Sequence, residues 1–115
     1  MDSRQFAEKV CSIISSHKGE DIVIIDVREK TDIADYYVIA SGRNMTHTKS
    51  LIEYVDVEMD KEGYMPTRSE GVREGRWAVL DYGDVIVHIF NDETRLFYHL
   101  ENLWGNSENI IKYNG

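Results

Sequence analysis

The chain of 115 residues has little that would stabilise it through covalent or metal cross-links. It contains one cysteine, Cys11, so no intramolecular disulfide forms and a thiolate metal cluster is excluded. One proline and eight glycines exclude collagen-like and proline-rich disordered proteins. Apolar runs such as 22–25 and 85–87 are far too short to cross a bilayer. The chain must therefore fold around its own apolar core.

Basic residues are also scarce. Lysine and arginine total 13 against 21 acidic residues, which leaves a net charge of −8. Phosphate backbones repel such a chain, so the composition disfavours nucleic-acid binding that is independent of sequence. An acidic chain is steered more readily toward a basic partner.

The length is that of a single domain, since domains usually have roughly 100–150 residues. Residues 1–6 lack the long apolar stretch of a signal peptide. We therefore expect a soluble, cytoplasmic protein with no membrane contact. Its one domain is expected over residues 1–105, followed by a C-terminal tail over 106–115.

Apolar residues at helical spacing predict three helices. Asp2, with Gln5 three residues on, caps the first, and Gly19 ends it. Cys11 lies within its apolar stripe and is expected to be an inert core residue. The second helix covers 46–62, and the third begins near residue 91 or 92 and ends at Gly105.

Short β-branched runs between these helices predict strands. Buried strands are expected over 22–27 and 34–42, and an edge strand over 64–69, where a proline is tolerated. Residues 76–82 and 85–90 form a hairpin around Gly83. The order predicts an α/β (α+β) fold, a mixed central sheet with helices packed on it. After Gly105 we expect either a mobile tail or an added edge strand.

One local feature raises the possibility of catalysis. Ser41-Gly42 closes a strand before a helix, as in folds that hold nucleotide phosphates. A nucleotidyltransferase-like enzyme would also need two close carboxylates to hold magnesium. The acids that follow are instead spaced as the outer face of a helix: Glu53, Asp56, Glu58 and Asp60. We therefore predict no enzyme activity, with the nucleotide-binding enzyme as the alternative.

The histidines do not predict a metal site. His17, His47, His88 and His99 are scattered, without a spacing that places two on one ion, and no serine lies in a nucleophile turn. We expect no metal and no cofactor. His88 falls on a strand beside apolar residues, where it is either a hydrogen-bonded core histidine or a contact with a partner.

The hairpin is the predicted partner site. Strand alternation places Trp77, Val79 and Asp81 on one face and Ala78, Leu80 and Tyr82 on the other. One face must meet the helices, so Trp77 is either core or interface. Tyr82 and Asp84 are expected to be exposed near the turn, where aromatic and acidic groups suit a basic partner. The predicted contact residues are Glu70, Arg76, Trp77, Asp81, Tyr82, Asp84 and His88.

Three sequence segments resemble a known protein family. They are A-D-Y-Y-V-I-A-S-G at 34–42, the segment 70–90, and R-L-F-Y-H-L-E-N-L-W-G at 95–105. Within 77–88, Trp-x-x-Leu-Asp-Tyr-Gly-Asp is followed by Val-x-Val-His. Together they resemble the ribosomal silencing factor family, also called RsfS or Iojap-like, from about Phe6 to Gly105. Tyr37 is a mild departure, since phenylalanine is common there.

The resemblance implies a fold related to nucleotidyltransferases but without their catalytic residues. It also implies binding to large-subunit ribosomal protein fourteen on the intersubunit face, which blocks joining of the subunits and represses translation when nutrients are scarce. Family members are often homodimers when free. A basic ribosomal protein suits an acidic factor. A homodimeric scaffold without ribosomal contact is a further alternative.

Overall fold

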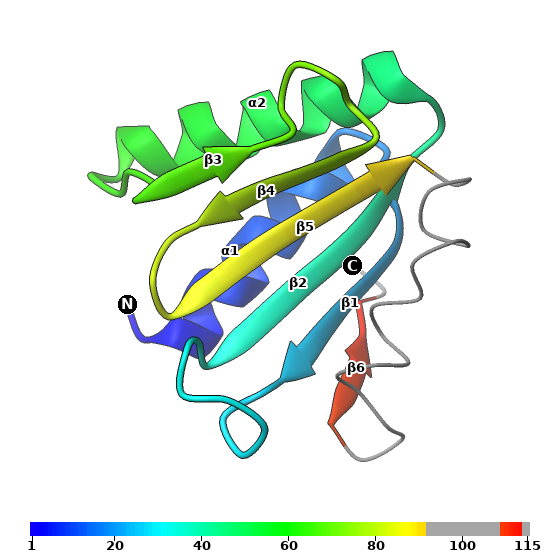
Figure 1. The fold of residues 1–115 in the computed structure, drawn as a ribbon. Coiled ribbons are helices and arrows are strands. Elements are labelled where there is room, and N and C mark those ends of the chain that lie inside the picture. The colour runs from blue at the N-terminus through cyan, green and yellow to red at the C-terminus, as the bar shows by residue number, and fades with distance from the viewer. Residues whose placement is uncertain (92–108, 114–115) are drawn as a thin grey trace.

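A computed structural model describes residues 1–91 and 109–113 of the chain. In these ranges two helices lie on one face of a six-stranded sheet with the order β3-β4-β5-β2-β1-β6 (Figure 1). The elements are α1 Ser3–Ser16, β1 Glu20–Asp26, β2 Tyr36–Gly42, α2 Met45–Lys61, β3 Arg68–Glu70, β4 Trp77–Asp81, β5 Val85–Asn91 and β6 Ile110–Lys112.

The sheet is mixed, as predicted. Its two central strands, β2 and β5, are parallel, and the other neighbouring pairs are antiparallel. The chain leaves β2, forms α2 on one face, adds β3 and β4 beyond β5, and returns through a hairpin into β5 (Figure 1). This topology brings the hairpin next to the central strand β2.

Both described helices begin directly after a capping residue. The Asp2 carboxylate accepts from the Gln5 backbone N–H at 2.8 Å, and the Gln5 side chain accepts from the Asp2 backbone N–H at 3.0 Å. This reciprocal capping box pairs two N–H groups that the helix itself leaves free. Asn44 caps α2, which therefore begins at Met45, one residue earlier than predicted. The third predicted helix, apart from its first candidate residue, lies outside the described residues.

Strand boundaries differ more from the predictions than helix boundaries do. β2 begins at Tyr36 instead of residue 34, and β1 begins at Glu20. β3 is an edge strand, as expected, but covers only Arg68–Glu70. Residues 110–112 of the C-terminal segment pair with β1 as β6. For these three residues the added edge strand is the correct alternative.

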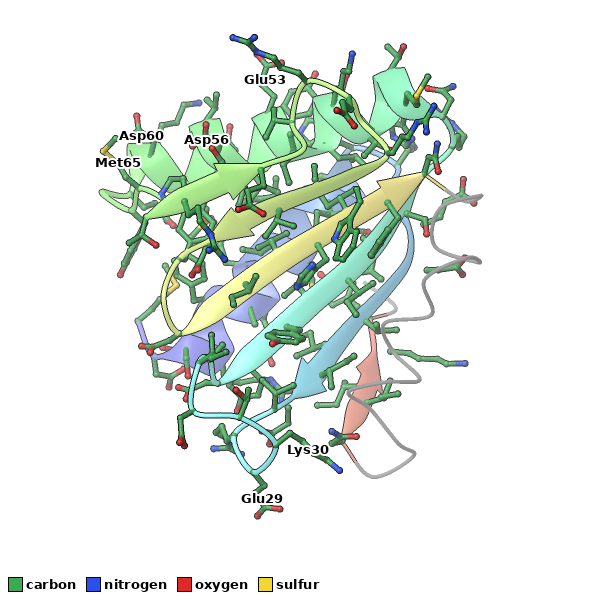
Figure 2. All side chains as sticks on the ribbon, viewed as in Figure 1. Glu29, Lys30, Glu53, Asp56, Asp60 and Met65 are labelled. Atoms are coloured by element: carbon green, nitrogen blue, oxygen red, sulfur yellow. The ribbon has the colours of Figure 1, made fainter. Side chains whose placement is uncertain are left out.

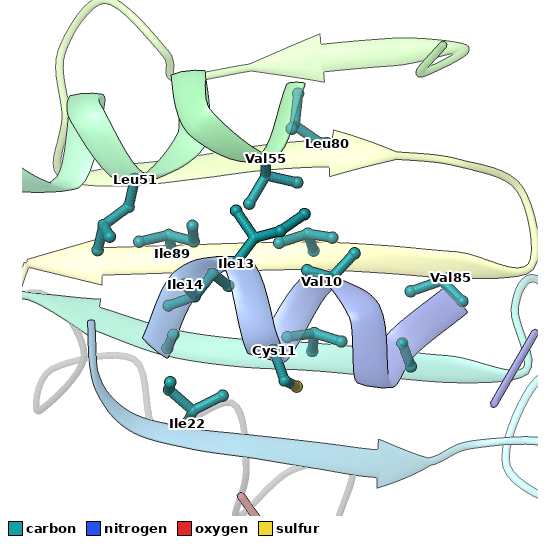
Figure 3. Packing of buried hydrophobic residues seen from close by; sticks show 14 of the residues in the cluster. Val10, Cys11, Ile13, Ile14, Ile22, Leu51, Val55, Leu80, Val85 and Ile89 are labelled. Carbon is teal, nitrogen blue, oxygen red and sulfur yellow. The ribbon is translucent and has the colours of Figure 1, made fainter. Parts of the chain in front are cut away.

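The main core lies between the helices and the sheet. Apolar side chains from α1 and α2 meet those of β1, β2, β4 and β5 (Figure 3). Ala78 and Leu80 of β4 are almost completely buried there. Cys11 is fully buried, which confirms its expected place in the core, and burial raises the pKa of its thiol to about 12.

A second apolar cluster lies on the opposite face of the sheet. It consists of the alternate strand residues and their neighbours: Val23, Ile25, Val27, Ala34, Tyr37, Ile39, Ile86 and Phe90, with Trp77, Val79 and Ile110 partly buried against it. The strands are thus apolar on both sides, as the β-branched runs predicted. Within the described ranges no helix is long and apolar enough to span a membrane.

Candidate partner-binding site

The β4–β5 hairpin is built by its turn. Gly83 has a φ of +89°, a conformation that favours glycine, and its N–H donates to the Asp81 carboxylate at 2.8 Å. The Tyr82 N–H donates to the Val85 carbonyl at 2.9 Å and closes the hairpin. This turn sets the register in which Trp77 lies opposite Phe90 and Val79 lies opposite His88.

Trp77 lies on the face of the sheet that is turned away from α1 and α2. It is partly buried, because its ring stacks on Phe90 with 5.1 Å between ring centroids. Its indole N–H donates to Nδ1 of His88 at 3.1 Å. Trp77 therefore does not belong to the core between helices and sheet, and part of its surface remains accessible.

His88 is a buried polar residue of this face, with 9% of its surface exposed. Its Nδ1 accepts from Trp77, its ring lies edge-on to that of Tyr37 with centroids 5.2 Å apart, and its Nε2 is buried without a hydrogen-bond partner in the described structure. Burial lowers the pKa of His88 to about 4, against the opposing effect of the Asp81 carboxylate. The imidazole is therefore neutral at pH 7. Only one of its two nitrogens is hydrogen-bonded, and an unpaired buried donor costs about 1–3 kcal/mol.

Charged groups continue this face toward the edge of the sheet. Arg68 and Glu70 of β3 lie opposite Asp81 and Val79 of β4. The Arg68 guanidinium is 3.8 Å from the Asp81 carboxylate and 3.6 Å from that of Glu70. Glu70 is exposed, whereas the Asp81 side chain is only 18% exposed. Sequence reasoning missed Arg68, although its alternation with Glu70 on a short strand was a usable signal.

The expectation that Tyr82 is exposed is wrong. Its ring packs on Phe6 of α1 with centroids 4.9 Å apart, and its hydroxyl is buried without a hydrogen-bond partner in the described structure. Burial, reinforced by Asp56 and Asp60 of α2, raises the pKa of the Tyr82 phenol. The residue follows strand alternation onto the helix side, where α1 covers it despite its place beside the turn.

The two remaining predicted residues are at the surface. Asp84 is exposed in the turn, as expected, while its backbone carbonyl accepts from the N–H groups of Asp35 and Tyr36. Arg76 is exposed just before β4, and its carbonyl accepts from the Asn91 N–H at 3.1 Å. The structure thus brings Glu70, Trp77, Asp81 and His88 onto one face and places Tyr82 on the other.

The Ser41-Gly42 segment has a packing explanation. A Cβ at Gly42 would lie 2.4 Å from the Thr48 hydroxyl, so glycine lets β2 approach α2 closely. Glu53, Asp56 and Asp60 lie on the outer side of α2, away from this segment (Figure 2). In residues 1–91 and 109–113, no group of three or more His, Cys, Asp or Glu residues is arranged to hold a metal ion.

The fold and this face define a small mixed-sheet protein whose aromatic and charged groups form a surface on one side of a hairpin. The sequence matches the family described as "Ribosomal silencing factor during starvation" over residues 1–114. The chain belongs to this ribosomal silencing factor family, which confirms the resemblance of its motifs.

Individual relatives agree with this assignment. The ribosomal silencing factor of Bacillus subtilis is 29% identical over 107 residues, covering 93% of this chain and 91% of the relative. The mouse protein named "Mitochondrial assembly of ribosomal large subunit protein 1" is 31% identical over 103 residues, covering 84% of this chain and 44% of the mouse protein. A crystal structure of a Chromobacterium violaceum protein has a TM-score of 0.89 at 29% identity, covering 93% of this chain and 90% of that one.

Proposed function

We propose that the protein binds the large ribosomal subunit through a basic ribosomal protein and represses translation by blocking the joining of the small subunit. The partner proposed from the family resemblance is large-subunit ribosomal protein fourteen. The name of the mouse relative, which refers to the ribosomal large subunit, supports this choice of subunit. The protein acts by occupying a surface, without catalysis and without a cofactor.

The observation that carries the proposal is the partly accessible Trp77 on a face that also holds acidic groups. Trp77 is a large aromatic group with a polar edge, the residue type that most often anchors protein interfaces. Glu70 and Asp81 lie on the same face, and the chain carries a net charge of −8. Acidic groups around an aromatic anchor suit a basic ribosomal protein.

The proposed binding surface consists of Glu70, Arg76, Trp77, Asp81 and Asp84, with His88 beneath Trp77. Tyr82 is left out because its ring and hydroxyl are turned toward α1. Trp77 is expected to dominate the free energy of binding, whereas the exposed charges mainly steer association.

The test is sedimentation of the protein with purified large subunits at low and high salt. We expect co-sedimentation that weakens as salt rises, because exposed charge pairs are screened. Trp77→Ala should weaken binding by about 2 kcal/mol or more if the indole is an anchor. Tyr54→Ala is the matched control, since Tyr54 is a 44% exposed aromatic on α2. Equal affinity for naked ribosomal RNA and for the isolated ribosomal protein would overturn the proposal.

The resemblance also supports a homodimer in the absence of ribosomes. Sedimentation velocity of the free protein over a range of concentrations measures this directly. A species of monomer mass at every concentration would contradict the homodimer without affecting the proposal of ribosome binding.

A further inference from the structure

We propose that His88 is a positioning residue that holds the Trp77 indole in the orientation in which it meets the ribosomal partner. The proposal rests on the proposed function for its biological meaning, because it concerns the anchor of that binding surface. The hydrogen bond between the two side chains is itself independent of any partner.

The geometry determines which proton His88 carries. The indole nitrogen of tryptophan is only a donor, so Nδ1 of His88, 3.1 Å away, must present its lone pair. The imidazole is therefore neutral with its proton on Nε2. This nitrogen is buried without a partner in the described structure. The tautomer that accepts the hydrogen bond from Trp77 therefore leaves a buried N–H unpaired.

Packing alone does not explain a histidine at this position. Aromatic rings pack around it on this face: the centroid of the Phe90 ring lies 6.5 Å away with the rings nearly parallel, and that of Tyr37 lies 5.2 Å away in an edge-on arrangement. A leucine would fill similar space without burying an unpaired N–H. What the imidazole adds is an acceptor directed at the Trp77 indole, and this acceptor compensates for the unpaired nitrogen.

Two contacts that Trp77 makes with described residues constrain different motions of its ring. Stacking on Phe90, with 26° between the planes, supports one side of the indole but allows it to slide and turn. The hydrogen bond to His88 defines where the nitrogen edge points. A side chain held in one orientation before binding loses less conformational entropy when its partner arrives.

Two nearly isosteric variants separate the acceptor from the shape. In His88→Asn, the amide oxygen occupies a position equivalent to Nδ1 and still accepts from the indole. In His88→Leu, a methyl group takes that position. Three quantities are measured: the urea midpoint, the hydrogen-exchange rate of the Trp77 indole N–H by NMR, and affinity for large subunits. Trp77→Phe assigns the indole signal, because the chain also contains Trp104.

We expect His88→Leu to fold with a urea midpoint no lower than that of the wild type. Its Trp77 indole N–H should exchange about five- to tenfold faster, and its affinity should fall by about fivefold, the effect of one net hydrogen bond. His88→Asn should retain most of the protection and affinity. Wild-type exchange and affinity in His88→Leu would overturn the proposal, as would equal losses in both variants, which would assign the effect to ring shape.

The measurements also distinguish this proposal from the proposed function. If the wild type does not bind large subunits, the proposed function fails. Indole exchange in the free protein still decides whether His88 holds Trp77, because that measurement requires no ribosome.

Discussion

The ring of Tyr82, beside the hairpin turn, packs against the ring of Phe6 in α1 with 4.9 Å between centroids. Phe6 in turn meets Tyr64 edge-on at 5.1 Å, so three aromatic residues from separate segments join at one corner of the molecule. Tyr82 therefore connects the β4–β5 hairpin to the helix layer. Its main contribution is to stability, and the residue is not part of the proposed binding surface.

Replacing Tyr82 separates its ring from its hydroxyl. Tyr82→Ala should lower the free energy of unfolding by about 2–4 kcal/mol. This loss is similar to the one expected for Leu80→Ala, which removes a fully buried side chain. Tyr82→Phe should leave stability unchanged or raise it by about 1 kcal/mol, because the hydroxyl it removes is buried without a partner in the described structure. Urea denaturation measures both. A loss in Tyr82→Phe as large as in Tyr82→Ala would show that the hydroxyl is hydrogen-bonded.

His88 predicts a stability that falls in mild acid. The folded-state pKa of about 4 lies below the ordinary value of 6.5, so the unfolded chain binds the proton more readily. Neutral His88 therefore contributes roughly 3 kcal/mol to the free energy of unfolding. This contribution is fully present above pH 6.5 and is lost as pH falls toward 4. Among residues 1–91 and 109–113, the titratable groups facing His88 are Asp81, which opposes the shift, and Tyr37, which stays neutral in this range.

The matched variant His88→Leu isolates this contribution from the many carboxylates that titrate in the same range. Urea denaturation of both proteins at pH 7 and pH 4.5 gives two differences in unfolding free energy. The wild type should lose more stability than the variant between these values. An equal loss in both proteins would contradict the assignment to His88.

Replacing Asp84 tests whether its charge speeds association with the ribosomal partner. Its carboxylate is exposed in the turn, so Asp84→Asn should slow association with large subunits by less than about tenfold at low salt and leave dissociation nearly unchanged. The difference from wild type should disappear at high salt. Glu53→Gln removes the same charge from the outer side of α2 and serves as the control (Figure 2). Equal slowing by both variants would assign the effect to net charge.

The burial of Cys11 predicts that its thiol does not react in the folded protein. It is fully buried, and its pKa of about 12 leaves almost no thiolate at pH 8. A colorimetric disulfide reagent should therefore react only after urea is added. Rapid reaction of the native protein would indicate frequent opening of α1 from the sheet.

Local patterns predicted those features that depend on neighbouring residues. Asp2 and Gln5 identify the start of α1, because a capping box needs only residues three apart. Gly83 identifies the hairpin, because the turn requires a positive φ. The mixed sheet followed from β-branched runs alternating with amphipathic helices. The family motif at 77–88 depends on the same local order of residues.

Features that depend on distant segments were not predictable in this way. The three residues of β6 carry too little pattern to indicate a strand, and only pairing with β1 makes them one. Strand alternation showed that Trp77 and Tyr82 lie on opposite faces, but not which face the helices cover. Both faces of the sheet carry apolar side chains, and α1 and α2 cover the side of Ala78 and Leu80, where their own apolar residues complete the main core. That packing turns the Tyr82 ring and hydroxyl toward α1, leaves Trp77 partly accessible on the other face, and places His88 beneath Trp77.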